Sequence, residues 1–130
     1  MTFKEFFMAV QKAVNGIVVN LDPEPTIING YQAFPESVDK GVYRYVVLPD
    51  NADTVYGGER VTGDILVESY AQSDEPEWAM ELSDKSRTLF NGLEGVTQTG
   101  PPIPSPNEPA VEAASVVRVS LRFPFLFVYG

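Results

Sequence analysis

The chain has 130 residues, and its 18 acidic against 9 basic residues give a formal net charge of −9. It contains no cysteine and no histidine, which excludes disulfides, thiol nucleophiles, the commonest general base and the commonest transition-metal ligand. The negative charge disfavours nonspecific binding to nucleic acid or to anionic membranes, and no apolar run approaches the ~18 residues of a membrane helix. We therefore expect one soluble domain over residues 1–130, with no metal ion and no cofactor.

The N-terminal segment predicts an amphipathic helix over residues 3–15. Thr2 and Glu5 match the capping-box pattern, and Asn15-Gly16 is a typical stop signal. The segment lacks the separate basic and apolar blocks of a signal peptide, so we expect no secretion. Its apolar residues recur at helical spacing: Phe3, Phe6, Phe7, Val10, Ala13 and Val14.

The next part of the chain predicts a pair of antiparallel strands joined by a long arm. Residues 17–19 and 26–28 have the composition of short strands, separated by a proline-rich link. Residues 42–48 are dense in β-forming side chains and predict a central strand. Residues 50–54 have the composition of a polar turn, and residues 59–70 resume strand character.

The arm contains a glycine-rich stretch over residues 57–63. It has the glycine content of a phosphate loop but lacks the Gly-Lys-Ser/Thr ending that places a lysine at the phosphates. We therefore interpret it as a flexible hairpin whose glycines permit positive φ.

A second amphipathic helix is predicted over residues 75–91. Pro76 and several acids suit its first turn, and Asn91-Gly92 marks its end. Trp78 is expected in its core rather than as a ligand platform. Its acidic residues predict a solvated helix face rather than a cation site: Asp74, Glu75, Glu77, Glu81 and Asp84.

The C-terminal region predicts an extended link followed by one long strand. Residues 100–109 contain five prolines and should run extended over the surface. Residues 117–129 alternate with one continuous apolar face, and the opposite face turns apolar again at Leu126 and Val128, so we expect cover on both sides there. Pro124 removes a backbone donor, which predicts a sheet edge or a bulge.

The element order of helix, strands, helix and strand indicates an α+β fold. We expect a mostly antiparallel sheet with two amphipathic helices packed on one face and an extended hairpin arm.

Four arginines occupy outward positions on the predicted strands: Arg44, Arg60, Arg118 and Arg122. The commoner arrangement makes them cross-strand partners of Glu59, Asp64 and Glu68, but arginine is also enriched at protein interfaces. Asp64 and Glu68 share one face of their strand, where a carboxylate pair for acid–base work is conceivable but lacks a defined pocket.

As a whole, the sequence resembles the tail-terminator (tail completion) proteins of long-tailed bacteriophages. The resemblance covers nearly the whole chain and lies in the order of its elements: the capped helix from Thr2 to Val14, Phe34-Pro35, the strand 43–48, the stretch 56–67, the acidic helix ending at Leu89-Phe90, and the strand 117–129.

The resemblance implies a structural virion protein of the tail or neck, assembled in the host cytoplasm, and not an enzyme. Such subunits form a ring of about six copies that ends polymerisation of the tail tube. The implied partners are other copies, the tail tube protein and a head-completion protein, while DNA passes through the bore without specific binding. Acidic loops would then face the bore, and the interface candidates are Arg44, Arg60, Arg118, Arg122 and Tyr56.

Two other interpretations remain open. A head–tail joining or head-closure protein of the neck has the same size, class and non-enzymatic role. A small soluble ligand-binding α+β domain would use a large aromatic set to line a pocket: Tyr31, Phe34, Tyr43, Tyr45 and Tyr56. An enzyme ranks below both, because no nucleophile–base pair is visible.

Overall fold

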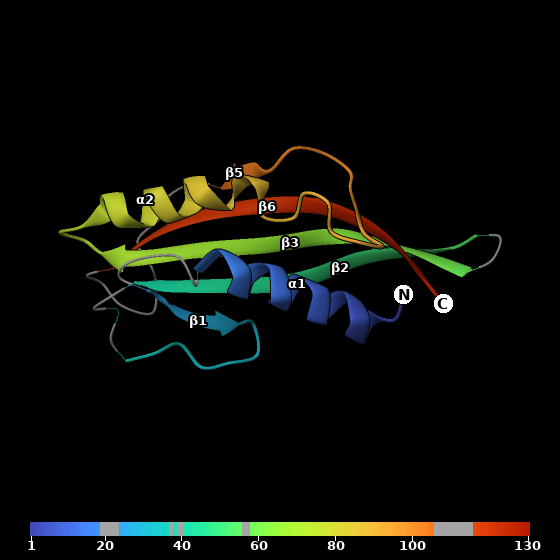
Figure 1. Ribbon diagram of the computed structural model, residues 1–130, viewed down its shortest axis with the longest axis horizontal. Helices are drawn as coiled ribbons and strands as arrows, with labels where there is room; N and C mark the ends of the chain where they lie inside the picture. The colour runs from blue at the N-terminus through green and yellow to red at the C-terminus, as the bar shows by residue number, and fades with distance from the viewer. Residues whose placement is uncertain (19–23, 37, 39–40, 56–57, 106–115) are drawn as a thin grey trace.

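The structure is a computed structural model that describes residues 1–18, 24–36, 38, 41–55, 58–105 and 116–130 (Figure 1). Its elements are α1 (Phe3–Val18), β1 (Thr26–Asn29), β2 (Val42–Val55), β3 (Gly58–Gln72), α2 (Pro76–Lys85), a 3-10 turn (Ser86–Thr88), β4 (Thr97–Gln98), β5 (Ile103–Ser105) and β6 (Val116–Tyr129). The strands form one six-stranded sheet with the order β1-β2-β3-β6-β4, and β5 also pairs with β6. Among the described strand pairs only β1 and β2 run parallel, which confirms the predicted α+β class with a mostly antiparallel sheet.

Helix α1 begins with the predicted capping box. The Thr2 backbone N–H donates to Glu5 Oε1 at 2.9 Å, and the Glu5 N–H donates to Thr2 Oγ1 at 3.1 Å. The backbone hydrogen bond from Thr2 lowers the pKa of the Glu5 carboxyl. The helix does not stop at Asn15-Gly16 but continues to Val18, so the strand predicted over 17–19 is wrong at its first two residues. Val19 lies outside the described residues.

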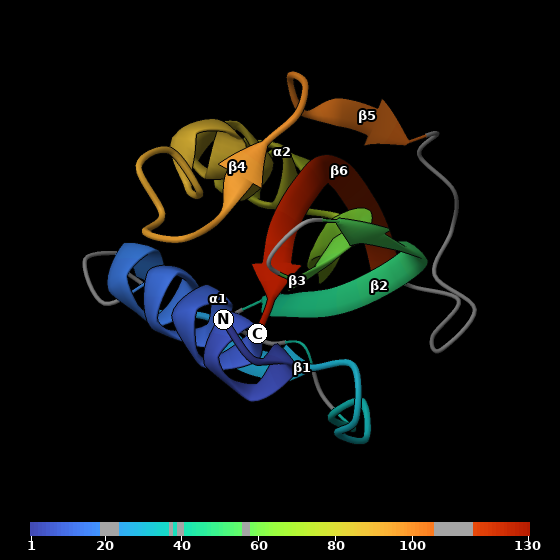
Figure 2. The same ribbon diagram turned by 90° about the vertical axis from the view of Figure 1, so that its right-hand side faces the viewer.

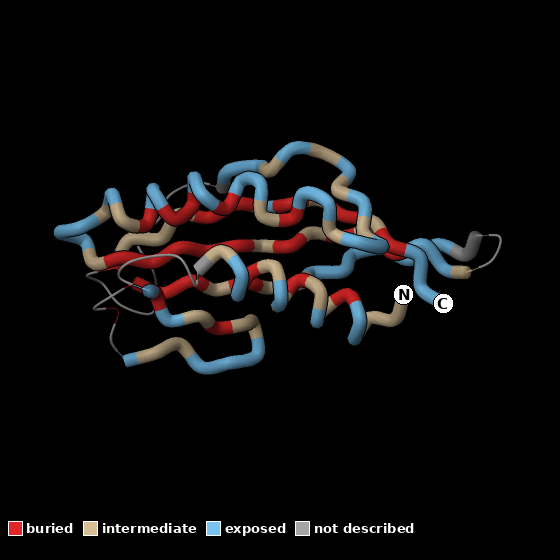
Figure 3. Tube along the Cα trace, in the orientation of Figure 1, coloured by how far each residue is buried: buried red, intermediate tan, exposed pale blue. Residues whose placement is uncertain are grey.

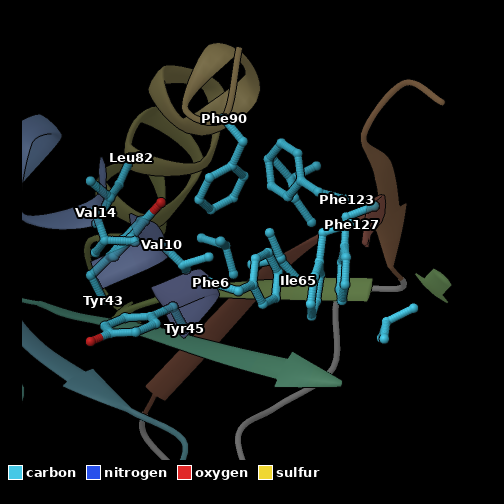
Figure 4. Packing of buried hydrophobic residues seen from close by; sticks show 14 residues of the cluster. Phe6, Val10, Val14, Tyr43, Tyr45, Ile65, Leu82, Phe90, Phe123 and Phe127 are labelled. Carbon is cyan, nitrogen blue, oxygen red and sulfur yellow. The ribbon is translucent and has the colours of Figure 1, made fainter. Parts of the chain in front are cut away.

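Both helices pack on the same face of the sheet, as predicted (Figure 2). The Phe6 ring of α1 lies 4.5 Å from that of Phe125 and 4.7 Å from that of Phe127, measured between ring centroids. Phe90, beyond α2, meets Phe123 edge-on at 4.9 Å (Figure 4). This aromatic layer buries the apolar face of β6 and joins the first helix to the last strand.

Helix α2 is shorter than the predicted 75–91. The Ser86 hydroxyl donates to the Leu82 carbonyl at 2.7 Å, one turn back, and such a bond weakens the continuing helix. The chain therefore passes into a 3-10 turn and reaches Gly92 at a φ of +73°. Trp78 is half-buried and packs against Gly41 rather than in the core of α2, whose buried residues are Ala79, Leu82 and Ser83.

Strand β6 lies inside the sheet, so the predicted sheet edge or bulge is wrong. It pairs with β3 without a register shift from Val116 to Tyr129. The Pro124 carbonyl accepts a hydrogen bond from Thr99 at 3.1 Å, on the side away from β3. Because the N and O of a strand residue face the same neighbour, the missing Pro124 donor costs no bond to β3. The Pro124 nitrogen points away from β3, to the side of β6 that is covered only by the short strands β4 and β5 among the described residues.

The end of β6 is exposed, contrary to the expected cover on both sides. Val128 is 45% exposed and Tyr129 is 43% exposed. The N-terminal amine of Met1 donates to the Val128 carbonyl at 3.0 Å and to the Gly130 carbonyl at 3.3 Å, which ties the two termini together. The proline-rich link is not wholly irregular, because Ile103–Ser105 form β5. Residues 106–115 lie outside the described residues.

Strands β2 and β3 continue together past the helices and the termini (Figure 1). We call their far part, residues 48–55 and 58–62, the arm. Residues 50–54 are therefore strand and not a turn. Gly58 and Gly63 do not have positive φ, and they are required for another reason: a Cβ at either would clash with backbone of a neighbouring strand.

Candidate interaction surface

The sheet face opposite the helices carries a buried carboxylate between two arginines. Glu68 is 4% exposed, and its Oε1 accepts from Arg44 Nη1 at 2.8 Å. Its Oε2 lies 3.6 Å from Arg118 Nη1. Arg44 is directly opposite Glu68 on β2, whereas Arg118 is opposite Tyr70 and reaches Glu68 on the diagonal. The cluster thus joins the three central strands.

The other two arginines make looser and more exposed pairs. Arg122 Nε lies 3.8 Å from Asp64, again on the diagonal, with its side chain 50% exposed. Arg60 pairs with Asp53 across the arm at 3.6 Å rather than with Glu59. The cross-strand arrangement predicted for the arginines is confirmed for Arg44, Arg118 and Arg122 and is wrong in its partner for Arg60.

These carboxylates do not form an acid–base pair. Asp64 and Glu68 share a sheet face as predicted, but each is paired with arginine. Among the described residues, no acidic side chains gather into a group that could hold a metal ion. Residues 58–63 of the glycine-rich stretch lie in β3, so they form no phosphate-binding loop.

The described part of the arm is mostly exposed (Figure 3), and its exposed charged side chains are mainly acidic. Asp50, Asp53 and Glu59 are all exposed, beside Leu48 at 42%. On the outer side of β2, strand β1 pairs only with Val42 to Tyr45, so within the described residues the outer edge from Val46 onward has no neighbouring strand. The arm is therefore the part of the sheet that the other described elements of the chain cover least.

The outer face of α1 presents a surface of opposite charge. Lys4, Met8 and Lys12 follow one another at i, i+4 spacing and are exposed, with Met8 at 52%. An open hollow of about 510 Å³ lies over this face, lined by Met8, Ala9, Gln11, Lys12 and Asn15. Tyr31 is 83% exposed, and its ring centroid lies 6.1 Å from that of Phe7.

The aromatic side chains expected around a ligand pocket do not come together. Tyr43 and Tyr45 belong to the core beneath the helices, and burial raises the pKa of both phenols. Phe34 lies on the other face, edge-on to Tyr70 at 4.8 Å. Tyr31 is on the surface, and Tyr56 lies outside the described residues.

The structure thus separates the predicted interface candidates. Arg44 and Arg118 meet at Glu68, Arg122 lies further along the same face, Arg60 lies on the arm, and Tyr56 is not described. Sequence reasoning missed the outer face of α1. The available signal was Met8, an apolar residue outside the helical stripe that predicts the buried face.

Comparisons with known proteins establish the fold and no activity. No protein-family model matches the chain, and no curated protein matches it. Among the solved structures that are similar, one aligns over 100% of this chain and 98% of its own, with a TM-score of 0.76 and 13% sequence identity. The name of that protein states no activity, ligand or partner, and at this identity the similarity shows the fold alone. In the part of the chain that the structure describes, neither helix has the length and apolar character needed to cross a bilayer.

Proposed function

We propose that this chain is a structural subunit of a bacteriophage neck that assembles as a ring on the end of the tail tube. The ring ends tube polymerisation and joins the tail to a head-completion protein. The observation that carries the proposal is the arm, an extension of β2 and β3 that continues past the helices. Its β3 side is paired with the end of β6, from Thr62–Leu126 to Glu59–Tyr129, whereas its outer β2 edge has no neighbouring strand among the described residues. Of the arm residues whose side chains are described, only Val61 is buried, so the arm adds little to the core of its own chain and is suited to contact with another.

The charge distribution supports a role beside DNA that does not grip it. The chain carries a formal net charge of −9. A ring lined by acids would repel the phosphate backbone and let DNA pass. The proposal needs no catalytic group.

The four arginines now differ as interface candidates. Arg44 and Arg118 are paired within the chain by a buried carboxylate, so reversing their charge would disturb folding before assembly. Arg60, with its side chain 48% exposed, is the candidate whose reversal tests assembly more directly. Arg60→Glu should therefore alter ring formation, and assembly unchanged from wild type would remove Arg60 from the interface.

The deciding experiment is the mass of the purified protein in solution. Light scattering over a range of concentrations, combined with electron microscopy of the same sample, should give rings of about six subunits. A monomer at every concentration would contradict the proposal.

The nearest alternative is a head–tail joining or head-closure protein, which shares the ring-forming logic. Binding of the assembled protein to isolated tail tubes, and not to filled heads, supports the terminator role. Binding to filled heads alone supports the alternative. The ligand-binding domain is less well supported, since the described aromatic residues line no common cavity.

A further inference from the structure

We infer that the acidic arm of one copy binds the outer face of α1 on a second copy. The inference rests on the proposed self-association and names the two surfaces that carry it. The donor surface is formed by Asp50 and Asp53, which lie on one face of the arm, where Asp50 accepts from Thr62 and Asp53 also pairs with Arg60 at 3.6 Å. The receiving surface, which we call the lysine face, is formed by Lys4, Met8 and Lys12 with the hollow beside them.

The open edge of the arm is poorly suited to pairing with another strand. Pro49 lacks a backbone donor, and the register of β2 against β3 shifts between Pro49 and Asn51. Charged side chains at Asp50 and Asp53 flank this irregularity, and proline, bulges and charges are the features that prevent edge-to-edge pairing. The arm therefore offers its side chains, rather than its backbone, to a neighbour.

The lysine face lacks its electrostatic partners within the chain. Among the described residues, neither Lys4 nor Lys12 forms an ion pair, whereas Lys85 pairs with Glu81 at 3.3 Å. Arg87 also forms no ion pair among the described residues, but it directly follows α2, whose charged side chains are mainly acidic. Two lysines about two turns apart on one helix face, without an ion pair among the described residues, mark this face as a place for an acidic partner in a chain of net charge −9.

The shape and composition of the lysine face also suit a protein partner. Met8 and Tyr31 are large, exposed and of the residue types enriched at interfaces. The hollow of about 510 Å³ could receive an apolar side chain such as Leu48, which accompanies the arm carboxylates and is 42% exposed.

The proposed contact joins two different patches, and it is heterologous when each copy gives its arm to one neighbour and its lysine face to another. Each copy then offers one arm and one lysine face, and a repeated contact of this kind closes into a ring when the rotation between copies allows it.

Paired charge reversals test the contact. Lys4→Glu with Lys12→Glu gives an acidic helix face, and Asp50→Lys with Asp53→Lys gives a basic arm. Each double variant alone should assemble at least about tenfold more weakly than wild type, because like charges then face each other. An equimolar mixture of the two should assemble again, since every contact between unlike copies pairs opposite charges.

A matched control separates the effect of charge on the arm from the effect of the net charge of the protein. Asp84→Lys with Glu94→Lys makes the same change in charge at exposed positions outside both surfaces, and it should assemble as wild type. Thermal melts verify that each variant is folded.

The outcomes distinguish the two proposals. If the arm variant and the helix variant each form rings as wild type does, the proposed contact is wrong but the proposed ring stands. Two disrupted variants that fail to complement each other would also overturn it. A wild-type monomer at all concentrations would overturn the contact and the proposed function together.

Discussion

Gly63 lies beside the point where β2 changes its register against β3. A Cβ at this position would meet the carbonyl oxygen and carbon of Leu48 and the Cα of Pro49, all of them backbone atoms that cannot rotate away. The close approach of β2 and β3 at the start of the arm thus requires a residue without a side chain at position 63.

We expect Gly63→Ala to lower the free energy of unfolding by about 1–3 kcal/mol, the usual cost of inserting atoms into a packed site. Gly16→Ala is the matched control, because a Cβ there meets nothing within 4 Å and alanine favours the helix. That variant should gain about 0.5–1 kcal/mol. Urea unfolding measures both, and a loss of similar size in the two variants would refute the explanation.

The buried phenol of Tyr43 is a group that links stability to alkaline pH. Its oxygen lies 2.6 Å from Ser86 Oγ, and because the Ser86 proton goes to the Leu82 carbonyl, Tyr43 is the donor. Burial raises the pKa of Tyr43 above its ordinary value, and the Ser86 hydrogen bond opposes this only in part. The neutral phenol is therefore the form that the fold stabilises.

A raised pKa in the folded state gives stability that is complete below the unfolded pKa of about 10 and is lost as pH rises further. Wild-type stability should therefore fall between about pH 9 and about pH 11, and Tyr43→Phe should fall less. At neutral pH the variant should lose about 1 kcal/mol with its hydrogen bond. Urea unfolding as a function of pH measures both, and an equal alkaline decline in the two proteins would contradict this assignment.

At the scale of elements, the Glu68 cluster joins β2, β3 and β6 across the face that lacks helices. Glu68→Gln leaves two arginines, each about a quarter exposed, facing a neutral group. We expect a loss of about 2–3 kcal/mol, below the cost of breaking a fully buried pair because water reaches the arginines.

Asp64→Asn is the control for this cluster, since its partner Arg122 is half exposed. It should cost less than ~1 kcal/mol. Thermal or urea unfolding of both variants measures the difference. Equal costs would mean that burial of Glu68 adds nothing.

The elements that local sequence could predict are those with a local cause. The helix after Thr2, the hairpin of β2 and β3, and the long terminal strand each have a cap or a side-chain period that is visible in the sequence. The place of β6 inside the sheet could not be predicted, because β4 and β5, the strands beside it, span only a few residues. The length of α2 depended on Ser86 and its contact with distant Tyr43.

The candidate site was predictable only in part, for a similar reason. The arginine pairs depend on which residues share a face of the sheet, and the alternation of apolar and polar residues along the strands indicates this. The pairs of Arg44, Arg118 and Arg122 could therefore be anticipated. The lysine face could not, because its importance lies in the absence of partners for Lys4 and Lys12 among the described residues. Only the folded arrangement reveals which charges remain unpaired.

At the scale of the whole molecule, the net charge predicts how the protein behaves toward DNA. A formal charge of −9 on 130 residues disfavours its approach to the phosphate backbone. The protein should therefore not retard double-stranded DNA in a gel at about 50 mM salt, where nonspecific binding is strongest. Retardation of the DNA by micromolar protein would contradict the proposal that DNA passes through the bore of the ring without being bound.

The long pairing of β3 with β6, unbroken from Glu59–Tyr129 to Gln72–Val116, also determines how the molecule bears force. Its hydrogen bonds lie perpendicular to the strands. Tension along the strands therefore loads the whole ladder in shear, and the two strands separate only when many bonds break together. A pull across them would open the bonds one at a time. The sheet is thus mechanically anisotropic, and its strong direction is the one in which the arm extends.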